Sequence, residues 1–195
     1  RRIKDIAHLQ SGDGLSAEEI SEAGQFPVFG GNGLRGYTTA FNHEGYFPLI
    51  GRQGALCGNI NYANGKFWAT EHAVVVTPLC RCDIVWLGEL LRIMNLNQYS
   101  NAAAQPGLSV DRIKYLRLPV PPIEEQVEMA EHIRGVNEKF TSLIRNLEEQ
   151  INTLSAYRKS LIHECVTGLR RVTDEDVKRA EAQWPGEKSL HKRSA

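Results

Sequence analysis

The sequence predicts an α+β protein, in which a β-rich domain is followed by one long coiled-coil helix. Up to about residue 118, short segments rich in β-branched and aromatic residues alternate with Gly, Asn and Pro. Beyond residue 122 the chain is almost free of helix breakers and repeats its apolar residues in heptads. A length of 195 residues suits one domain with an appendage. We therefore divide the chain into 1–121, 122–168 and a tail, 169–195.

The first part contains several predicted strands and one predicted helix. The stretch from Cys82 to Leu96 has the length and apolar spacing of a helix, and 111–116 is expected to form a helical turn. The strand segments are bounded by Gly, Asn and Pro. They are QFPVFG (25–30), GYFPLIG (45–51), GNINYA (58–63), KFWAT (66–70), HAVVVTP (72–78) and YLRLPV (115–120).

A long helix is predicted from Ile123 to Thr167. Pro122 is acceptable as its first residue, and Gly168 stands where a left-handed C-terminal cap is favoured. Forty-five residues would span about 67 Å, more than a small domain needs to cover its core. In the tail, a short helix is expected from Thr173 to about Gln183, with disorder beyond Pro185.

The apolar residues of this helix predict a coiled coil. The second heptad row holds Val136, Leu143 and Tyr157 and is interrupted by Gln150 and Glu164. Ala130, Ile144 and Ile151 widen the apolar stripe, which indicates that the helix also contacts a second surface. The alternative is a long helix that lies on its own domain. The first heptad row is unbroken and predicts the coiled-coil seam: Ile133, Phe140, Leu147, Leu154 and Leu161.

Composition restricts the protein class. Lys plus Arg and Asp plus Glu number 23 each, so the net charge does not indicate a polyanionic partner, although a local basic groove remains possible. The four cysteines are scattered and are expected to be reduced thiols. No segment approaches the roughly 20 apolar residues of a membrane span, and the first residues lack the apolar core of a secretory signal. A cytoplasmic, non-membrane protein is expected.

Catalytic motifs are missing from the sequence. It contains no phosphate-binding G-x-x-x-x-G-K-[ST] loop, no G-x-S-x-G nucleophile turn and no H-E-x-x-H zinc motif. The neighbours His72 and Glu71 are not expected to act together, because adjacent strand residues point to opposite faces, and the same holds for His43 and Glu44. A metal site formed by Cys80, Cys82 and His72 would lack a fourth ligand. We predict no catalytic residues and no metal site.

The remaining polar residues beside turns suit base recognition. The stretch FPVFGGNGLRGY (26–37) is rich in glycine, but no helix follows it, so it predicts a tight turn rather than a phosphate-binding loop. Arg can contact guanine with two hydrogen bonds, and Asn or Gln can do so with adenine. Alternatively, Asn and Gly only satisfy turn geometry. The candidate DNA-binding residues are Asn32, Arg35, Arg52, Gln53, Asn59, His72 and Gln105.

The order of motifs resembles half of a type I restriction-modification specificity subunit. FPVFGGNGLRGY is followed by PLIGRQGALCGNINYANGKFWATEHAVVV, then by QPGLSVDRIKYLRLPVPPIEEQVEMAEHI and LIRNLEEQINTLSAYRKSLIHECVTG. The match covers about 3–168. The long helix starts with LPVPPIEEQ and ends with YRKSLIHECVTG, and both stretches resemble the helical spacer of the family. The β-rich part resembles a target-recognition domain.

The resemblance implies a non-catalytic subunit that reads double-stranded DNA. Such subunits hold two recognition domains at the ends of an antiparallel helical spacer, so that each reads half of a bipartite site. They bind methyltransferase subunits, which use S-adenosylmethionine, and in restriction complexes a restriction subunit. This chain has one domain and one helix, and is expected to be either a fragment or a half-subunit. A half-subunit would form a homodimer in which the first heptad row, from Ile133 to Leu161, pairs with that of a second copy. Two other hypotheses are a coiled-coil scaffold whose β domain binds protein or glycan, and a small nuclease acting alone.

Overall fold

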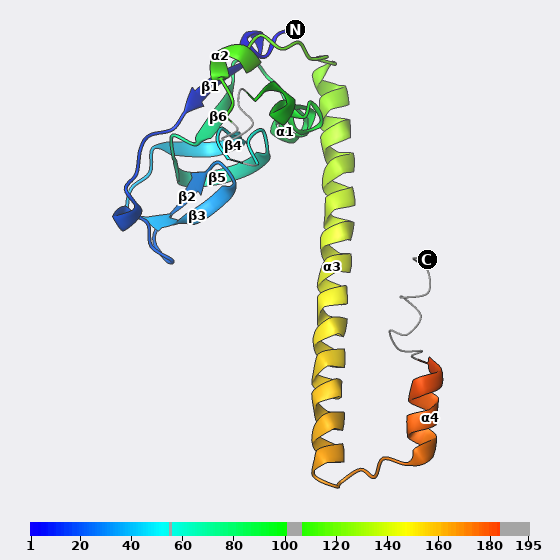
Figure 1. Ribbon diagram of the computed structural model, residues 1–195. Helices are drawn as coiled ribbons and strands as arrows, with labels where there is room; N and C mark the ends of the chain where they lie inside the picture. Colours follow the sequence, from blue (N-terminus) through cyan, green and yellow to red (C-terminus); the bar gives the residue numbers. More distant parts are fainter. Residues whose placement is uncertain (55, 101–106, 184–195) are drawn as a thin grey trace, which may run out of the picture. The chain divides into compact units, whose positions relative to one another are not determined.

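The computed structural model describes residues 1–54, 56–100 and 107–183 (Figure 1). The chain divides into two compact units, Arg1–Gly135 and the residues from Val136 onward. The division falls inside helix α3 (Ile123–Val166), so the first turns of this helix belong to the β-rich domain. The boundary that we expect from the sequence lies just before this helix, at residue 121. The predicted disorder beyond Pro185 concerns residues outside those described.

Within the described residues, six strands form one mixed sheet in the order β1-β6-β4-β5-β2-β3. The neighbouring strands are antiparallel except β2 and β5, which are parallel. The predicted α+β class is confirmed. The strands are β1 (Ala7–Ser11), β2 (Phe26–Gly30), β3 (Gly33–Thr38), β4 (His43–Gly51), β5 (Ile60–Ala69) and β6 (Ala73–Pro78).

The helices include the two long segments that the sequence predicts. The segment 82–96 forms α1 (Ile84–Ile93), and the helical turn at 111–116 is α2 (Val110–Ile113). Helix α3 ends at Val166, one residue before the predicted end, and Gly168 follows with a φ of +77°. The remaining helices are α4 (Asp174–Gln183) and the short 3-10 helices η1 (Ile3–Asp5), η2 (Ala17–Glu19) and η3 (Leu96–Tyr99).

Three strand predictions need correction. The segments GNINYA and KFWAT belong to one strand, β5, and the strands β1 and β3 were not predicted. The segment YLRLPV forms only a single bridge, between Arg117 and Arg2. Its backbone bonds go to the N-terminal residues instead: Ile3 N donates to Leu116 O at 3.0 Å. Because Ile3 begins a 3-10 turn, no continuous ladder can form there.

The main core lies between the sheet and α1. Ile50 of β4, Val74 of β6, and Leu87 and Leu91 of α1 are fully buried in it. Each such side chain contributes about 1.5–3 kcal/mol to stability. Ala130 of α3 is also fully buried in this core, so the first turns of α3 form part of the domain.

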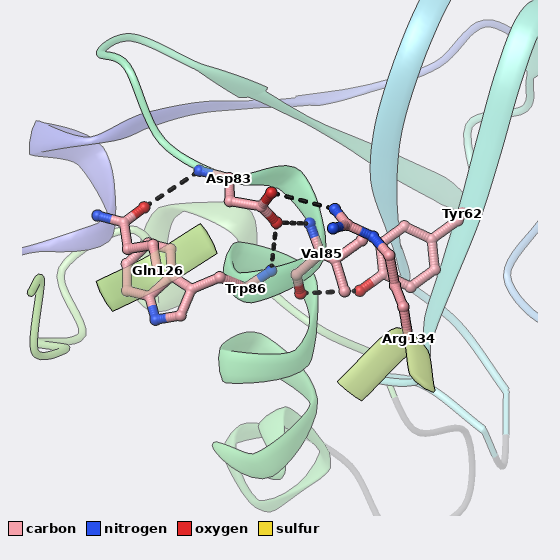
Figure 2. Close-up of polar contacts among 6 residues, drawn as sticks. All are labelled: Tyr62, Asp83, Val85, Trp86, Gln126 and Arg134. Carbon is pink, nitrogen blue, oxygen red and sulfur yellow. Dashed lines mark hydrogen bonds and ion pairs between the residues drawn. The ribbon is translucent and has the colours of Figure 1, made fainter. Parts of the chain in front are cut away.

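Asp83 joins α1 to the start of α3 (Figure 2). Its carboxylate accepts hydrogen bonds from the backbone N of Val85 at 2.8 Å and of Trp86 at 3.0 Å, which caps the helix. The Asp83 backbone N donates to the side-chain oxygen of buried Gln126 at 3.1 Å. Arg134 Nη2 donates to the other carboxylate oxygen, also at 3.1 Å. The start of α3 is therefore fixed to the domain by polar as well as apolar contacts.

Candidate nucleic-acid interface

The glycine-rich segment 26–37 forms the β2–β3 hairpin. Gly30 pairs with Gly33, so Gly31 and Asn32 make the connection, and the Asn32 side chain is exposed. Gly33 has a φ of +96°, which a side chain rarely adopts, and a Cβ there would lie 3.0 Å from Asn61 Oδ1. The predicted tight turn is confirmed.

The hairpin turn packs closely on the end of β4. A Cβ on Gly51 would lie 2.0 Å from the carbonyl oxygen of Gly31, so the two backbones meet where no side chain fits. A Cβ on Gly31 would lie 3.1 Å from Gln53 O and 3.2 Å from His72 O. The turn that carries Asn32 is thus brought against the segments that carry Gln53 and His72.

Arg52 connects three segments at this place. Its backbone N donates to His72 O at 2.8 Å, and its guanidinium Nη1 donates to Ser11 Oγ at 3.1 Å. The Arg52 side chain is half-buried, so its direction is restricted. Together with the hairpin turn, these contacts gather five of the predicted DNA-binding residues, which we call the turn cluster: Asn32, Arg35, Arg52, Gln53 and His72.

Arg35 lies on the second strand of the hairpin. A Cβ on Gly30 would lie 2.4 Å from Arg35 Cδ, so the aliphatic part of the arginine crosses the glycine on the neighbouring strand. The residue is exposed. The absence of a side chain at Gly30 therefore gives Arg35 a flat surface on which to lie.

His72 is accompanied by Glu71. His72 Nε2 lies 3.2 Å from Glu71 Oε1. This corrects our expectation that the two neighbours point apart, because both lie in the turn between β5 and β6 and not in a strand. Glu71 is thus a candidate contact residue that sequence reasoning missed, and a carboxylate can accept a hydrogen bond from a cytosine amino group.

The two other predicted DNA-binding residues are Asn59 and Gln105. The carbonyl oxygen of Asn59 accepts a hydrogen bond from Gly51 N at 2.9 Å, which closes the loop after β4. Its side chain is half-buried. Gln105 lies outside the described residues. The turn cluster therefore contains neither of them.

A polar network fixes the chain just after Ser11, the residue whose hydroxyl accepts the hydrogen bond from Arg52. Asn42 Nδ2 donates to Asp13 Oδ2 and to Ala69 O, both at 2.9 Å. His43 Nδ1 lies 2.8 Å from Asn42 Oδ1, and its ring stacks on Phe67. Burial lowers the pKa of His43, although the nearby Asp13 carboxylate opposes this shift. Ser11 and Asp13 gave no sequence signal, because β1 itself was not predicted.

The predicted dimerisation row occupies α3. Phe140, Leu147 and Leu154 are 60%, 48% and 66% exposed, which is unusual for large apolar side chains. Leu161 is half-buried. Ile133 differs, because it packs against the core of the β-rich domain.

Within residues 1–54, 56–100 and 107–183, no helix is long and apolar enough to cross a membrane. No group of three or more His, Cys, Asp or Glu side chains there is arranged to hold a metal ion.

Comparison with known proteins relates the chain to restriction-modification systems. Residues 1–153 match the family model described as the type I restriction modification DNA specificity domain. The type I restriction enzyme EcoprrI specificity subunit of Escherichia coli is 42% identical over 153 residues, which are 76% of this chain and 37% of that protein. A putative type I restriction enzyme specificity subunit of Haemophilus influenzae is 29% identical over 110 residues, 55% of this chain and 29% of that protein.

Solved structures show the same fold. The S subunit of the type I restriction-modification system from M. genitalium superposes with a TM-score of 0.66 at 20% identity, over 84% of this chain and 44% of that one. The HsdS subunit from Thermoanaerobacter tengcongensis gives a TM-score of 0.59 at 16% identity, over 84% and 43%. This chain thus spans less than half the length of these relatives. With more than three quarters of its residues matched by the family model, the chain belongs to the type I restriction modification DNA specificity domain family.

Proposed function

We propose that this chain is a non-catalytic DNA-specificity subunit that reads one half of a bipartite double-stranded target. The observation that carries the proposal is the turn cluster, in which three separate segments bring two arginines, an asparagine, a glutamine and a histidine to one place. Such side chains supply both donors and acceptors for base edges. Family membership supports this role.

The proposal also includes a homodimer. The exposed row Phe140, Leu147 and Leu154 would be covered by the same row of a second copy. A twofold dimer would read an inverted repeat with a spacer. The neutral net charge suggests that partners supply part of the phosphate contacts on which affinity depends.

Those partners are methyltransferase subunits and, where restriction occurs, a restriction subunit. The chain itself would need no cofactor, because S-adenosylmethionine would be bound by the methyltransferase. We further propose that the protein acts in the cytoplasm, where such a complex would bind DNA.

Selection from a randomised duplex DNA library tests the proposal. The chain is used alone and with a methyltransferase subunit, and an Arg35→Ala/Arg52→Ala double variant serves as the matched control. We expect enrichment of an inverted repeat by the unsubstituted chain and loss of that motif with the variant. A library that stays random in both conditions would refute DNA reading, whereas an enriched single half-site would refute only the twofold dimer.

A further inference from the structure

The β-rich domain has an apolar groove bordered by carboxylates. The groove, of about 900 Å³, lies between α1 and the first turns of α3. Its apolar lining is formed by Trp86, Leu90, Ile93, Met129 and Ile133. Glu125 and Glu128 also line the groove and are exposed, whereas Glu89 is already held by Arg92 and Tyr62. Ile93 is 77% exposed, an unusually open position for a large apolar side chain. An apolar surface of this kind suits a partner segment with apolar and basic residues.

The chain after α3 has this composition. Val166 and Leu169 are 81% and 78% exposed, and Val172 is exposed as well. Arg170 and Arg171 lie between Leu169 and Val172, so three apolar and two cationic side chains fall within the seven residues 166–172. We call 166–172 the exit segment.

Charge favours antiparallel pairing of two α3 helices. The helix begins with four glutamates within its first nine residues, at 124, 125, 128 and 131, and the basic residues Arg158, Lys159, Arg170 and Arg171 lie near or beyond its end. A parallel pair would place glutamates beside glutamates. An antiparallel pair places the acidic start of each helix beside the basic end of the other.

The heptad rows then fix a register. In an antiparallel pair, each residue of the first row faces one of the second row. If the twofold axis lies midway between Leu147 and Gln150, Phe140 faces the partner's Tyr157 and Leu143 faces the partner's Leu154. Val136 likewise faces the partner's Leu161, so most layers of the seam are apolar. This register places Val166, the last helical residue of the partner's α3, opposite Glu131, next to the groove. The partner's exit segment continues from that point.

We infer that the groove binds the exit segment of a second copy of this chain. The partner's Leu169 and Val172 enter between α1 and α3, while the partner's Arg170 and Arg171 face the exposed carboxylates of Glu125 and Glu128. The inference rests on the proposed homodimer and adds a second contact to it. Each chain supplies one groove and one exit segment, as twofold symmetry requires.

Disulfide trapping in the full chain tests this arrangement. Cys80 and Cys165 are first replaced by Ser, and Glu128→Cys is then combined with Leu169→Cys. Under mild oxidation we expect most chains to run as a covalent dimer on a non-reducing gel. In the matched control, Glu138→Cys replaces Glu128→Cys, which moves the thiol about three turns along α3 and away from the seam. This control is expected to stay monomeric on the gel.

A second pair of cysteines, placed in the coiled-coil seam, distinguishes the possible failures. Leu143→Cys with Leu154→Cys should also give a covalent dimer if the helices pair antiparallel. Trapping of the seam pair without the groove pair would overturn the groove inference and leave the homodimer intact, with the groove free for another subunit. Failure of both pairs would overturn the antiparallel dimer itself. DNA selection by the unsubstituted chain reports separately on the proposed function.

Discussion

The guanidinium of Arg134 donates a hydrogen bond to the Asp83 carboxylate at 3.1 Å, and so connects α3 to the N-terminus of α1. Asp83 is 14% exposed, whereas Arg134 is 45% exposed. The same carboxylate caps α1 through Val85 N and Trp86 N. One side chain therefore stabilises a helix terminus and a contact between two helices.

Asp83→Ala is expected to lower the free energy of unfolding by about 1–2 kcal/mol, because two backbone donors lose their acceptor. Arg134→Ala removes only a partly exposed ion pair and should cost less than about 1 kcal/mol. Urea unfolding followed by tryptophan fluorescence measures both changes. Equal losses in the two variants would contradict the expectation that the Asp83 helix cap contributes more stability than the ion pair with Arg134.

Gly88 of α1 contacts Tyr62 so closely that a Cβ would lie 2.2 Å from the phenol oxygen. Tyr62 is held there, since its hydroxyl donates to Glu89 Oε1 at 3.0 Å and lies 3.2 Å from Val85 O. We therefore expect Gly88→Ala to destabilise the domain by about 1–3 kcal/mol. Gly135→Ala is the control, because a Cβ there meets nothing within 4 Å. Gly135→Ala should raise the free energy of unfolding by about 0.5–1 kcal/mol, because alanine favours the helix more than glycine does. Thermal unfolding of the two variants measures both changes.

Arg52→Ala and Asn32→Ala should each weaken binding to the selected DNA site by about 1–3 kcal/mol if these side chains contact bases. Binding to unrelated DNA should fall less. Arg81→Ala is the matched control, because Arg81 follows the far end of β6 from His72 and is exposed. Fluorescence anisotropy at fixed salt measures the affinities. Equal losses on both DNAs would show that the residues contact phosphates.

Leu147→Lys combined with Leu154→Lys is expected to convert a dimer to a monomer, because it places four charges in an apolar seam. Light scattering gives the solution mass. Asn152→Lys with Ser155→Lys adds the same charge on another face of α3 and should leave the mass unchanged. A seam variant that keeps the dimer mass would show that this row does not mediate pairing.

The stability of the domain should fall as the pH is lowered through about 6.5, the ordinary pKa of histidine. Burial lowers the pKa of His43 in the folded state, so below pH 6.5 the unfolded chain binds more protons than the folded one. The loss levels off below the folded-state pKa. Urea unfolding at pH 7.5 and pH 5 should show a smaller difference in His43→Gln than in the unsubstituted chain. An identical difference would exclude His43 as a source of the pH dependence.

The sequence predicted the features that depend on local patterns. The heptads identified α3 to within one residue at its end, and the glycine spacing identified the hairpin turn. Features that depend on distant partners were not predictable: Ser11 becomes relevant only because Arg52 contacts it 41 residues later. Likewise, YLRLPV has the composition of a strand, but its neighbour in space is the 3-10 turn at Ile3.

The close approach of Gly31 and Gly51 means that the turn cluster is built on main-chain contacts. Among the described residues, the side chains of Asn32, Arg35 and Gln53 make no hydrogen bond, so substitutions at these positions leave the scaffold intact. If the turn cluster reads DNA as proposed, single substitutions at these positions would change the bases contacted at little cost in stability, whereas the glycines beneath it would not tolerate side chains. Folding and target contact would then depend on different residues of the same turn.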